Sequence, residues 1–120
     1  MIERSKILQK DRLFRRFEQE DFNEQGLKSS AFSDPVDEPS VHLEKLADFY
    51  KIEKTYDETV AYGVFIAGEL RNNNFDAEHR PLDEDCSHSV ILAPEGKLTR
   101  TLRRKLKTLI SETIFIKNLP

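Results

Sequence analysis

The sequence predicts an α+β domain, in which a small, mostly antiparallel sheet is covered on one face by a C-terminal amphipathic basic helix. Residues 60–70 and 89–93 carry strand signals, and residues 98–110 carry the clearest helical repeat of the chain. A sheet with its helices gathered on one face and at one edge belongs to the α+β class. A chain of 120 residues can bury one core of its own, so we expect a single domain over residues 1–120.

The N-terminal segment favours a helix over about residues 3–18. Ile7, Phe14 and Phe17 recur at spacings of seven and three, as on one face of an amphipathic helix. The run LFRRF, which contains both phenylalanines, is equally compatible with a short strand. Residues 29–40 are rich in Ser, Pro and Asp and are expected to form a connecting loop.

A second helix is expected over residues 41–53. Leu43, Leu46 and Tyr50 fall at positions i, i+3 and i+7, and Ser40 is available as an N-cap.

The strongest strand signal runs over residues 60–70. One parity of this stretch is bulky and apolar and includes Tyr62 and Val64. The other parity includes Gly63 and Ala67 and is nearly flat, which suits a closely packed helix, or a backbone or ligand that approaches there.

The C-terminal third is expected to begin with a polar loop over residues 75–89. A strand over residues 89–93 follows, antiparallel to the first strand, and Pro94 ends it. A helix comes next, because apolar residues recur at i, i+4, i+8, i+11 and i+12, namely Leu98, Leu102, Leu106, Leu109 and Ile110. Residues 113–116 either add a short edge strand or extend that helix.

Charges of opposite sign are separated along the chain, although the net charge is only −3. Residues 1–16 hold six bases and two acids, a net charge of +4, and residues 97–120 hold seven bases and one acid, a net charge of +6. The 80 residues between them hold 19 acids and six bases, a net charge of −13. Either the basic ends fold back on the acidic middle, or they form a surface that attracts an acidic partner protein or a polyanion.

If the basic ends form such a surface, six cations are predicted to bind the partner. Nucleic acid is the weaker of the two partner classes, because an acidic body repels phosphate unless it faces away. The predicted partner-binding residues are Arg15, Arg16, Arg100, Arg103, Arg104 and Lys107.

Candidate catalytic groups gather where the polar loop meets the second strand. His88 is placed there to act as a general acid or base, with Asp85 or Glu84 to orient it. Arg80 would stabilise developing negative charge, and His42 is the candidate second histidine of a ribonuclease-type mechanism. These residue types make a small hydrolase or nuclease one functional hypothesis. Histidines more commonly have a structural role.

Metal, cysteine and nucleotide chemistry are all disfavoured. His79, Cys86 and His88 offer metal-ligand types, but their spacing matches no standard zinc pattern. The acids before Cys86 oppose formation of a nucleophilic thiolate. Gly63 and Gly68 lie inside a strand pattern and do not form a phosphate-binding loop. We therefore expect no metal and no cofactor.

Composition also bears on the compartment. The single cysteine, Cys86, excludes an intramolecular disulfide and favours a reducing environment. No apolar run approaches the roughly 18 to 20 residues that span a bilayer, and the charged N-terminus is unlike a signal peptide. A cytoplasmic protein without a membrane partner is expected.

Three short segments resemble, in order and spacing, a family of small uncharacterised bacterial proteins. They are Ser29-Ser30-Ala31-Phe32, then Ser40-Val41 leading to Leu43, then His88-Ser89-Val90-Ile91. The resemblance implies a bacterial cytosolic protein and supplies no catalytic residue. Residues 84–87 depart from the family pattern, which has an Asn-Pro type turn before the histidine.

The leading functional hypothesis is a non-catalytic interaction module, an accessory subunit of a bacterial multi-protein system. It would dock an acidic partner protein through its charge-segregated surface, and that association would be sensitive to salt. The alternatives are the hydrolase or nuclease centred on His88 and a nucleic-acid-binding protein that uses both basic ends.

Overall fold

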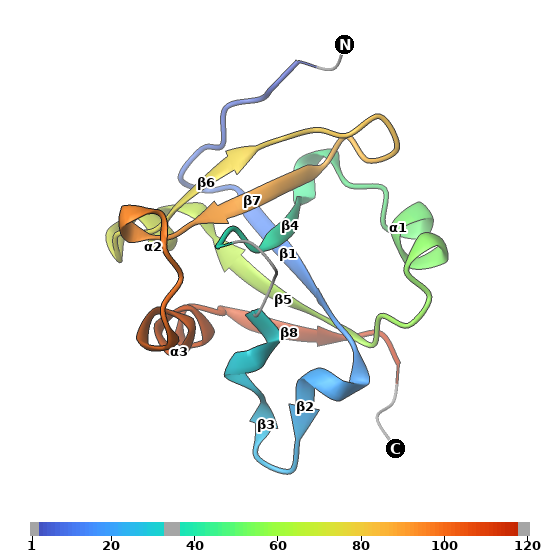
Figure 1. Ribbon diagram of the computed structural model, residues 1–120. Coiled ribbons are helices and arrows are strands. Elements are labelled where there is room, and N and C mark those ends of the chain that lie inside the picture. Colours follow the sequence, from blue (N-terminus) through green and yellow to red (C-terminus); the bar gives the residue numbers. More distant parts are fainter. Residues whose placement is uncertain (1–2, 33–36, 118–120) are drawn as a thin grey trace.

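The centre of the molecule is a six-stranded sheet with the strand order β6-β7-β4-β1-β5-β8, in which every neighbouring pair is antiparallel (Figure 1). The computed structural model describes residues 3–32 and 37–117, so residues 33–36 of the predicted 29–40 loop lie outside the described residues. The strands of the sheet are β1 (Arg12–Phe17), β4 (Ser40–Leu43), β5 (Ala61–Ile66), β6 (Asp76–His79), β7 (His88–Leu92) and β8 (Glu112–Phe115).

The predicted α+β class is confirmed, because α-helices pack against this sheet. Within the described ranges they are α1 (Phe49–Thr55), α2 (Ala67–Asn72) and α3 (Arg100–Thr108). A small separate hairpin pairs β2 (Phe22–Asn23) with β3 (Gly26–Leu27) and projects from the sheet (Figure 1). Short 3-10 turns join these elements at Gln19–Asp21, Ser29–Phe32, Glu44–Leu46 and Pro94–Gly96.

The larger core cluster covers one face of the sheet. Leu13 and Phe17 of β1 and Phe65 of β5 are fully buried there, and Leu106 of α3 is buried against them. The predicted cover of one sheet face by the C-terminal helix is therefore confirmed, because the α3 leucines belong to this cluster together with Phe65.

A smaller cluster lies on the opposite face. Phe14, Tyr62 and Val64 are buried there, and Phe49 at the start of α1 packs on Phe14 with 4.9 Å between ring centroids. Both faces of β1 and β5 are thus covered, which is why β5 reads as a nearly continuous apolar run and β1 shows no simple alternation.

The predicted N-terminal helix over residues 3–18 is wrong, because residues 12–17 form the strand β1 inside the sheet. Leu13 and Phe17 point to one face and Phe14 to the other, and all three are buried. Helical spacing appeared because a strand covered on both faces has no strict alternation. The run LFRRF, which is also compatible with a strand, is the part that folds as one.

The predicted helix over residues 41–53 is correct only at its end. Ser40–Leu43 form the strand β4, and α1 begins at Phe49, capped by the Asp48 side chain, which accepts a hydrogen bond from the Lys51 N–H. Tyr50 is 78% exposed, so the Leu43, Leu46 and Tyr50 stripe is not one buried face.

The predicted strand over residues 60–70 is correct over Ala61–Ile66, and α2 begins at Ala67. As expected, neighbouring atoms lie very close to the flat face of this strand. A Cβ atom at Gly63 would lie 2.5 Å from the Phe17 ring. Gly68, now in α2, donates a hydrogen bond to the Gln9 carbonyl, and a Cβ there would lie 3.0 Å from that oxygen. Glycine at both positions makes room for a neighbour.

The C-terminal predictions hold with two changes. The predicted strand over 89–93 is β7, which runs antiparallel to β5 but is separated from it by β4 and β1. The predicted polar loop over 75–89 contains the edge strand β6 at its start. The predicted helix is α3, and the open choice for residues 113–116 is resolved as the edge strand β8, paired with β5.

Candidate functional site

The predicted catalytic trio comes from three neighbouring strands. His42 lies in β4, and His88 begins β7 directly opposite, as its Cα partner in the β4–β7 pair. Arg80 follows β6, and its carbonyl oxygen accepts a hydrogen bond from His88 Nδ1 at 2.8 Å. The structure therefore places the two histidines on adjacent strands and holds the His88 ring by the backbone of residue 80.

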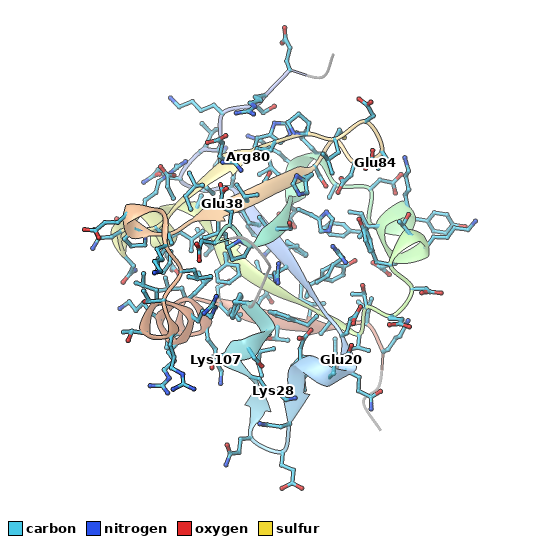
Figure 2. All side chains as sticks on the ribbon, viewed as in Figure 1. Glu20, Lys28, Glu38, Arg80, Glu84 and Lys107 are labelled. Carbon is cyan, nitrogen blue, oxygen red and sulfur yellow. The ribbon has the colours of Figure 1, made fainter. Side chains whose placement is uncertain are left out.

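The Arg80 guanidinium is engaged in ion pairs. It lies 2.6 Å from Glu38 and 3.0 Å from Glu78, and Figure 2 shows Arg80 beside Glu38. The hydrogen bond to Glu38, followed by the one to Glu78, raises the pKa of Arg80 above its usual value. Both acids would have to release this side chain before it could stabilise charge on a substrate.

His42 is the centre of a buried polar network. Its Nδ1 lies 3.0 Å from Asp85 Oδ2 and 3.2 Å from Ser87 Oγ, and its Nε2 accepts a hydrogen bond from Arg16 Nε at 2.9 Å. The Ser87 hydroxyl donates to Asp85 Oδ1 at 2.6 Å. Asp85, predicted to orient His88, therefore orients His42, because the loop before β7 folds back over β4.

The hydrogen bonds define the state of His42. Arg16 Nε can only donate, so His42 Nε2 is the unprotonated acceptor and Nδ1 carries the proton that points at Asp85. Burial lowers the pKa of His42 to about 4, against the opposing influence of Asp85. His42 is therefore neutral near pH 7.

The network has the residue types of a serine-nucleophile triad but not its connectivity. In such a triad the acid binds one histidine nitrogen and the serine hydroxyl faces the other. That second nitrogen removes the hydroxyl proton. Here Ser87 and Asp85 both lie on the Nδ1 side of His42, and Arg16 occupies Nε2. Ser87 is also fully buried. This arrangement favours a structural role for Ser87, in which it fixes the Asp85 side chain, rather than a role as a catalytic nucleophile.

Arg15 and Arg16, predicted to bind a partner, are bonded inside the fold. Arg15 donates from its two terminal nitrogens to the carbonyl oxygens of Ser40 and Ala31, at 2.8 and 2.9 Å. The Arg16 guanidinium stacks on the Tyr56 ring, 3.5 Å from its centroid, and burial lowers the pKa of Arg16. Their place in a central strand explains this, because both sheet faces supply acceptors and aromatic rings.

The four predicted cations of α3 have a different setting. They recur at i, i+3, i+4 and i+7, which places them on one face of the helix, opposite the buried leucines. We call them the α3 basic face, and they are Arg100, Arg103, Arg104 and Lys107. Three are exposed and Arg103 is half-buried, and within the described ranges no carboxylate forms an ion pair with any of them.

Lys28 extends the α3 basic face and was not predicted from the sequence. It follows β3 and lines, together with Lys107 and Ser29, a shallow hollow of about 280 Å³ between the hairpin and α3 (Figure 2). Residues 28 and 107 are far apart in the sequence, so only the docking of the hairpin beside α3 joins them.

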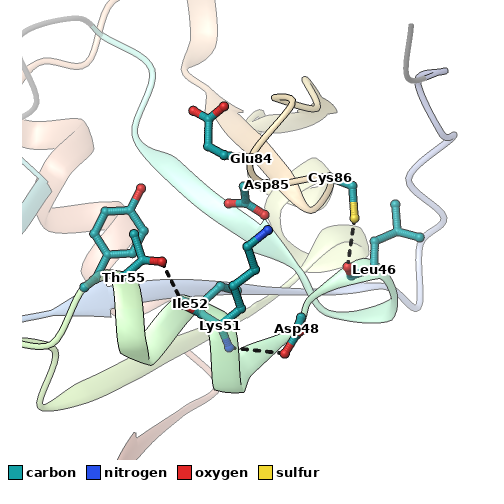
Figure 3. A pocket seen from close by; sticks show the side chains of 9 residues that line it. Leu46, Asp48, Lys51, Ile52, Thr55, Glu84, Asp85 and Cys86 are labelled. Atoms are coloured by element: carbon teal, nitrogen blue, oxygen red, sulfur yellow. Dashed lines mark hydrogen bonds between the residues drawn. The ribbon is translucent and has the colours of Figure 1, made fainter.

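A second hollow, of about 240 Å³, lies between α1 and the loop that precedes β7 (Figure 3). Leu46 and Ile52 supply its apolar wall, while Glu84, Asp85 and Lys51 supply charged groups. Its contact with the His42 network, through Asp85, was missed from the sequence. A local signal exists, because Asp85 accepts from the Ser87 N–H at 3.0 Å, as in an Asx turn.

The metal-ligand types considered from the sequence do not come together. His79 is buried, its Nδ1 accepts from the Ser5 N–H at 2.7 Å, and its Nε2 donates to the Cys86 carbonyl at 2.6 Å. Both ring nitrogens of His79 therefore serve the backbone. Within the described ranges, the one group with ligand atoms close enough together is Glu18, Glu20 and Glu58, which is a largely exposed acidic cluster.

Comparison with known proteins finds no matching family model, no matching curated protein and no matching solved structure. Among the described segments, no helix combines the length and the apolar character needed to cross a bilayer.

Proposed function

We propose that this chain is a non-catalytic interaction module, an accessory subunit of a bacterial multi-protein system, that docks an acidic partner protein through the α3 basic face. The observation that carries the proposal is the electrostatic state of that face. Four cations share one side of a helix, without an acidic neighbour in ion-pair range among the described residues, while their backbone is anchored by the buried leucines behind it.

A rigid cationic stripe of this kind suits electrostatic docking. The helix backbone is already ordered by the core, so a partner need not order it on binding, and complementary charge accelerates association. Lys28 widens the stripe toward the β2–β3 hairpin, because it shares a hollow with Lys107. A partner that presents clustered carboxylates would neutralise both the α3 basic face and Lys28.

The two alternatives have less support. The hydrolase or nuclease hypothesis needs His88, His42 and Arg80 free to reach one substrate, but Arg16 occupies His42 Nε2 and two acids hold Arg80. The nucleic-acid hypothesis needs both basic ends on one open surface, and the cations of β1 are bonded inside the fold.

The test measures binding to two defined polyanions. A fluorescent 20-residue poly-glutamate and a 20-base-pair DNA duplex are titrated with the full chain at low and at physiological salt. We expect the carboxylate probe to bind, with an affinity that falls as salt rises. The variant Arg100→Glu/Arg103→Glu/Arg104→Glu should bind at least about tenfold more weakly, because three attractive contacts become repulsive.

A matched variant separates the α3 basic face from net charge. Lys6→Glu/Lys10→Glu/Lys54→Glu makes the same charge change at exposed lysines outside α3 and should retain most of the affinity. Equal losses in the two variants would reject the proposal, and so would tighter binding of DNA than of poly-glutamate. Circular dichroism of each variant confirms that the fold is kept.

A further inference from the structure

The pocket between α1 and the loop before β7 has the lining of a site for a small organic cation. Its floor is apolar, from Leu46 and the buried Ile52. Around this floor stand three carboxylates and one ammonium group, from Asp48, Glu84, Asp85 and Lys51. The lining therefore carries a net charge of about −2 at pH 7, taking all four groups as ionised.

Asp85 is the anchor of this negative charge. Its side chain is only 14% exposed. The Ser87 hydroxyl and N–H donate to Oδ1, and His42 Nδ1 lies 3.0 Å from Oδ2. Burial acts to raise the pKa of Asp85, but the hydrogen bonds from the Ser87 hydroxyl and N–H, together with the facing His42 ring, outweigh it and keep the pKa below its usual value. Asp85 is therefore an ionised carboxylate in a fixed position.

The other charges frame the opening. Glu84 is exposed on the same loop as Asp85, and Lys51 extends from α1 toward that loop (Figure 3). Within the described part of the chain no carboxylate lies in ion-pair range of Lys51. The pocket thus holds more negative charge than its own lysine neutralises.

We infer that this pocket binds an alkylammonium group, with the ammonium head at Asp85 and Glu84 and the aliphatic stem on Leu46 and Ile52. An apolar floor with a few fixed polar groups is the usual composition of a ligand site. The volume of about 240 Å³ is below the roughly 300 to 1,000 Å³ of sites for drug-sized ligands. The occupant is accordingly a single side chain or a ligand of a few heavy atoms.

The inference is independent of docking at α3, because no residue of the α3 basic face lines this pocket. A ligand of about five heavy atoms binds weakly even in a good site, so a dissociation constant on the order of 1 mM is expected for the simplest occupant.

The experiment is a titration of the isotope-labelled full chain followed by amide NMR. Three probes of nearly equal size are compared at pH 7, namely n-butylammonium, n-butanol and butyrate. Butylammonium should shift the amides of residues 48–56 and 84–87, butanol should bind at least about fivefold more weakly, and butyrate more weakly still. Binding of butanol or butyrate as tight as that of the cation would overturn the inference.

Variants with opposite expected effects on butylammonium affinity sharpen the test. Asp85→Asn should weaken butylammonium binding about tenfold and Glu84→Gln about twofold to threefold, because the Asp85 carboxylate is only 14% exposed and Glu84 is exposed. Lys51→Met should tighten binding about twofold to threefold, because it removes the pocket's own cation while its stem length is kept.

Asp83→Asn is the matched control, because Asp83 is an exposed acid of the same loop that does not line the pocket. It should leave the affinity unchanged. Asp85→Asn also disturbs the His42 network, so Glu84→Gln and Lys51→Met are the variants that test the site in an intact fold. A loss with Asp83→Asn equal to that with Glu84→Gln would overturn the inference, as would weaker binding with Lys51→Met.

Two further probes identify the source of the cation. Nα-acetyl-lysine methylamide represents a lysine side chain of a partner protein, and 1,4-diaminobutane represents a free amine. Tighter binding of the lysine derivative than of butylammonium indicates a protein side chain, and exclusion of that derivative while the diamine binds indicates a free amine. If neither probe shifts the pocket amides, the inference is wrong.

Discussion

The two basic ends of this chain have similar charge but opposite surroundings. In the N-terminal segment, Arg4 pairs with Glu78 at 2.7 Å, Arg12 pairs with Glu112 at 3.1 Å, and Arg16 is bonded to His42. The α3 basic face makes no ion pair within the described residues. Arg12 and Arg16 lie in β1, a central strand with neighbours on both sides and both faces, whereas α3 touches the core along one side only.

The comparison teaches that a basic run in a sequence is not by itself a binding surface. A cation is available to a partner only when the fold leaves it without acceptors, and this depends on the element in which the cation lies. The same distinction predicts how strongly each end contributes to stability, and three measurements examine it.

The largest difference is expected between Arg16 and Arg104. Arg16→Met should lower the free energy of unfolding by about 3 kcal/mol, because it leaves His42 Nε2 without its donor and removes the guanidinium from the Tyr56 ring. Arg104→Met, on the exposed side of α3, should change it by less than about 0.5 kcal/mol. Urea unfolding followed by circular dichroism measures both, and equal effects would show that the two ends do not differ energetically.

The second prediction concerns pH. The folded-state pKa of His42 is about 4, below the ordinary value of 6.5, so the unfolded chain binds a proton here more readily than the folded one. The resulting stability is fully present above about pH 6.5 and is lost as the pH falls toward 4, by up to about 3 kcal/mol.

An NMR titration of the His42 ring checks this directly. Its resonances should keep the neutral, Nδ1-protonated pattern well below pH 6, and urea unfolding between pH 7 and 4.5 should show the matching loss of stability. A titration midpoint near 6.5 for His42 would show that burial in this network does not lower the His42 pKa.

The smallest expected effect lies in α3. Arg100 is the first residue of the helix, where the helix dipole disfavours positive charge, so Arg100→Glu should raise the free energy of unfolding by about 0.3 kcal/mol. Lys107→Glu, in the last turn, should lower it by a similar amount. Thermal unfolding at low salt measures both. A loss above about 1 kcal/mol with Arg100→Glu would mean that Arg100 has an intramolecular role.

The fold was predictable where the apolar residues of an element form a simple pattern. The leucine repeat of α3 marks a helix with one buried and one exposed face, and the two apolar runs that became β5 and β7 mark strands. The helix prediction for residues 12–17 is wrong because both faces of β1 are covered while three arginines interrupt its apolar residues, so neither alternation nor a continuous apolar run marks the strand. The predicted strand pattern continues over residues 67–70, but the chain forms α2 there, packed against β6.

The candidate site was predictable by residue type but not by pairing. His42, Arg16 and Asp85 were each noted, yet their hydrogen bonds join positions 26 and 43 residues apart. Such pairs depend on strand order and register, and a register shift of one residue would move His42 to the other face of the sheet. Lys28 and Lys107 meet only through the placement of the hairpin beside α3.

Local information in the chain was sufficient for the α+β class, for α3 and for the cationic stripe that α3 carries, because these follow from side chains within a few turns or residues of one another. The folded molecule alone settled which cations are neutralised, that Asp85 belongs with His42, and that a negative pocket opens beside α1. These features arise from contacts between strands and loops that are distant in sequence, and their energies depend on the burial and geometry of the assembled sheet.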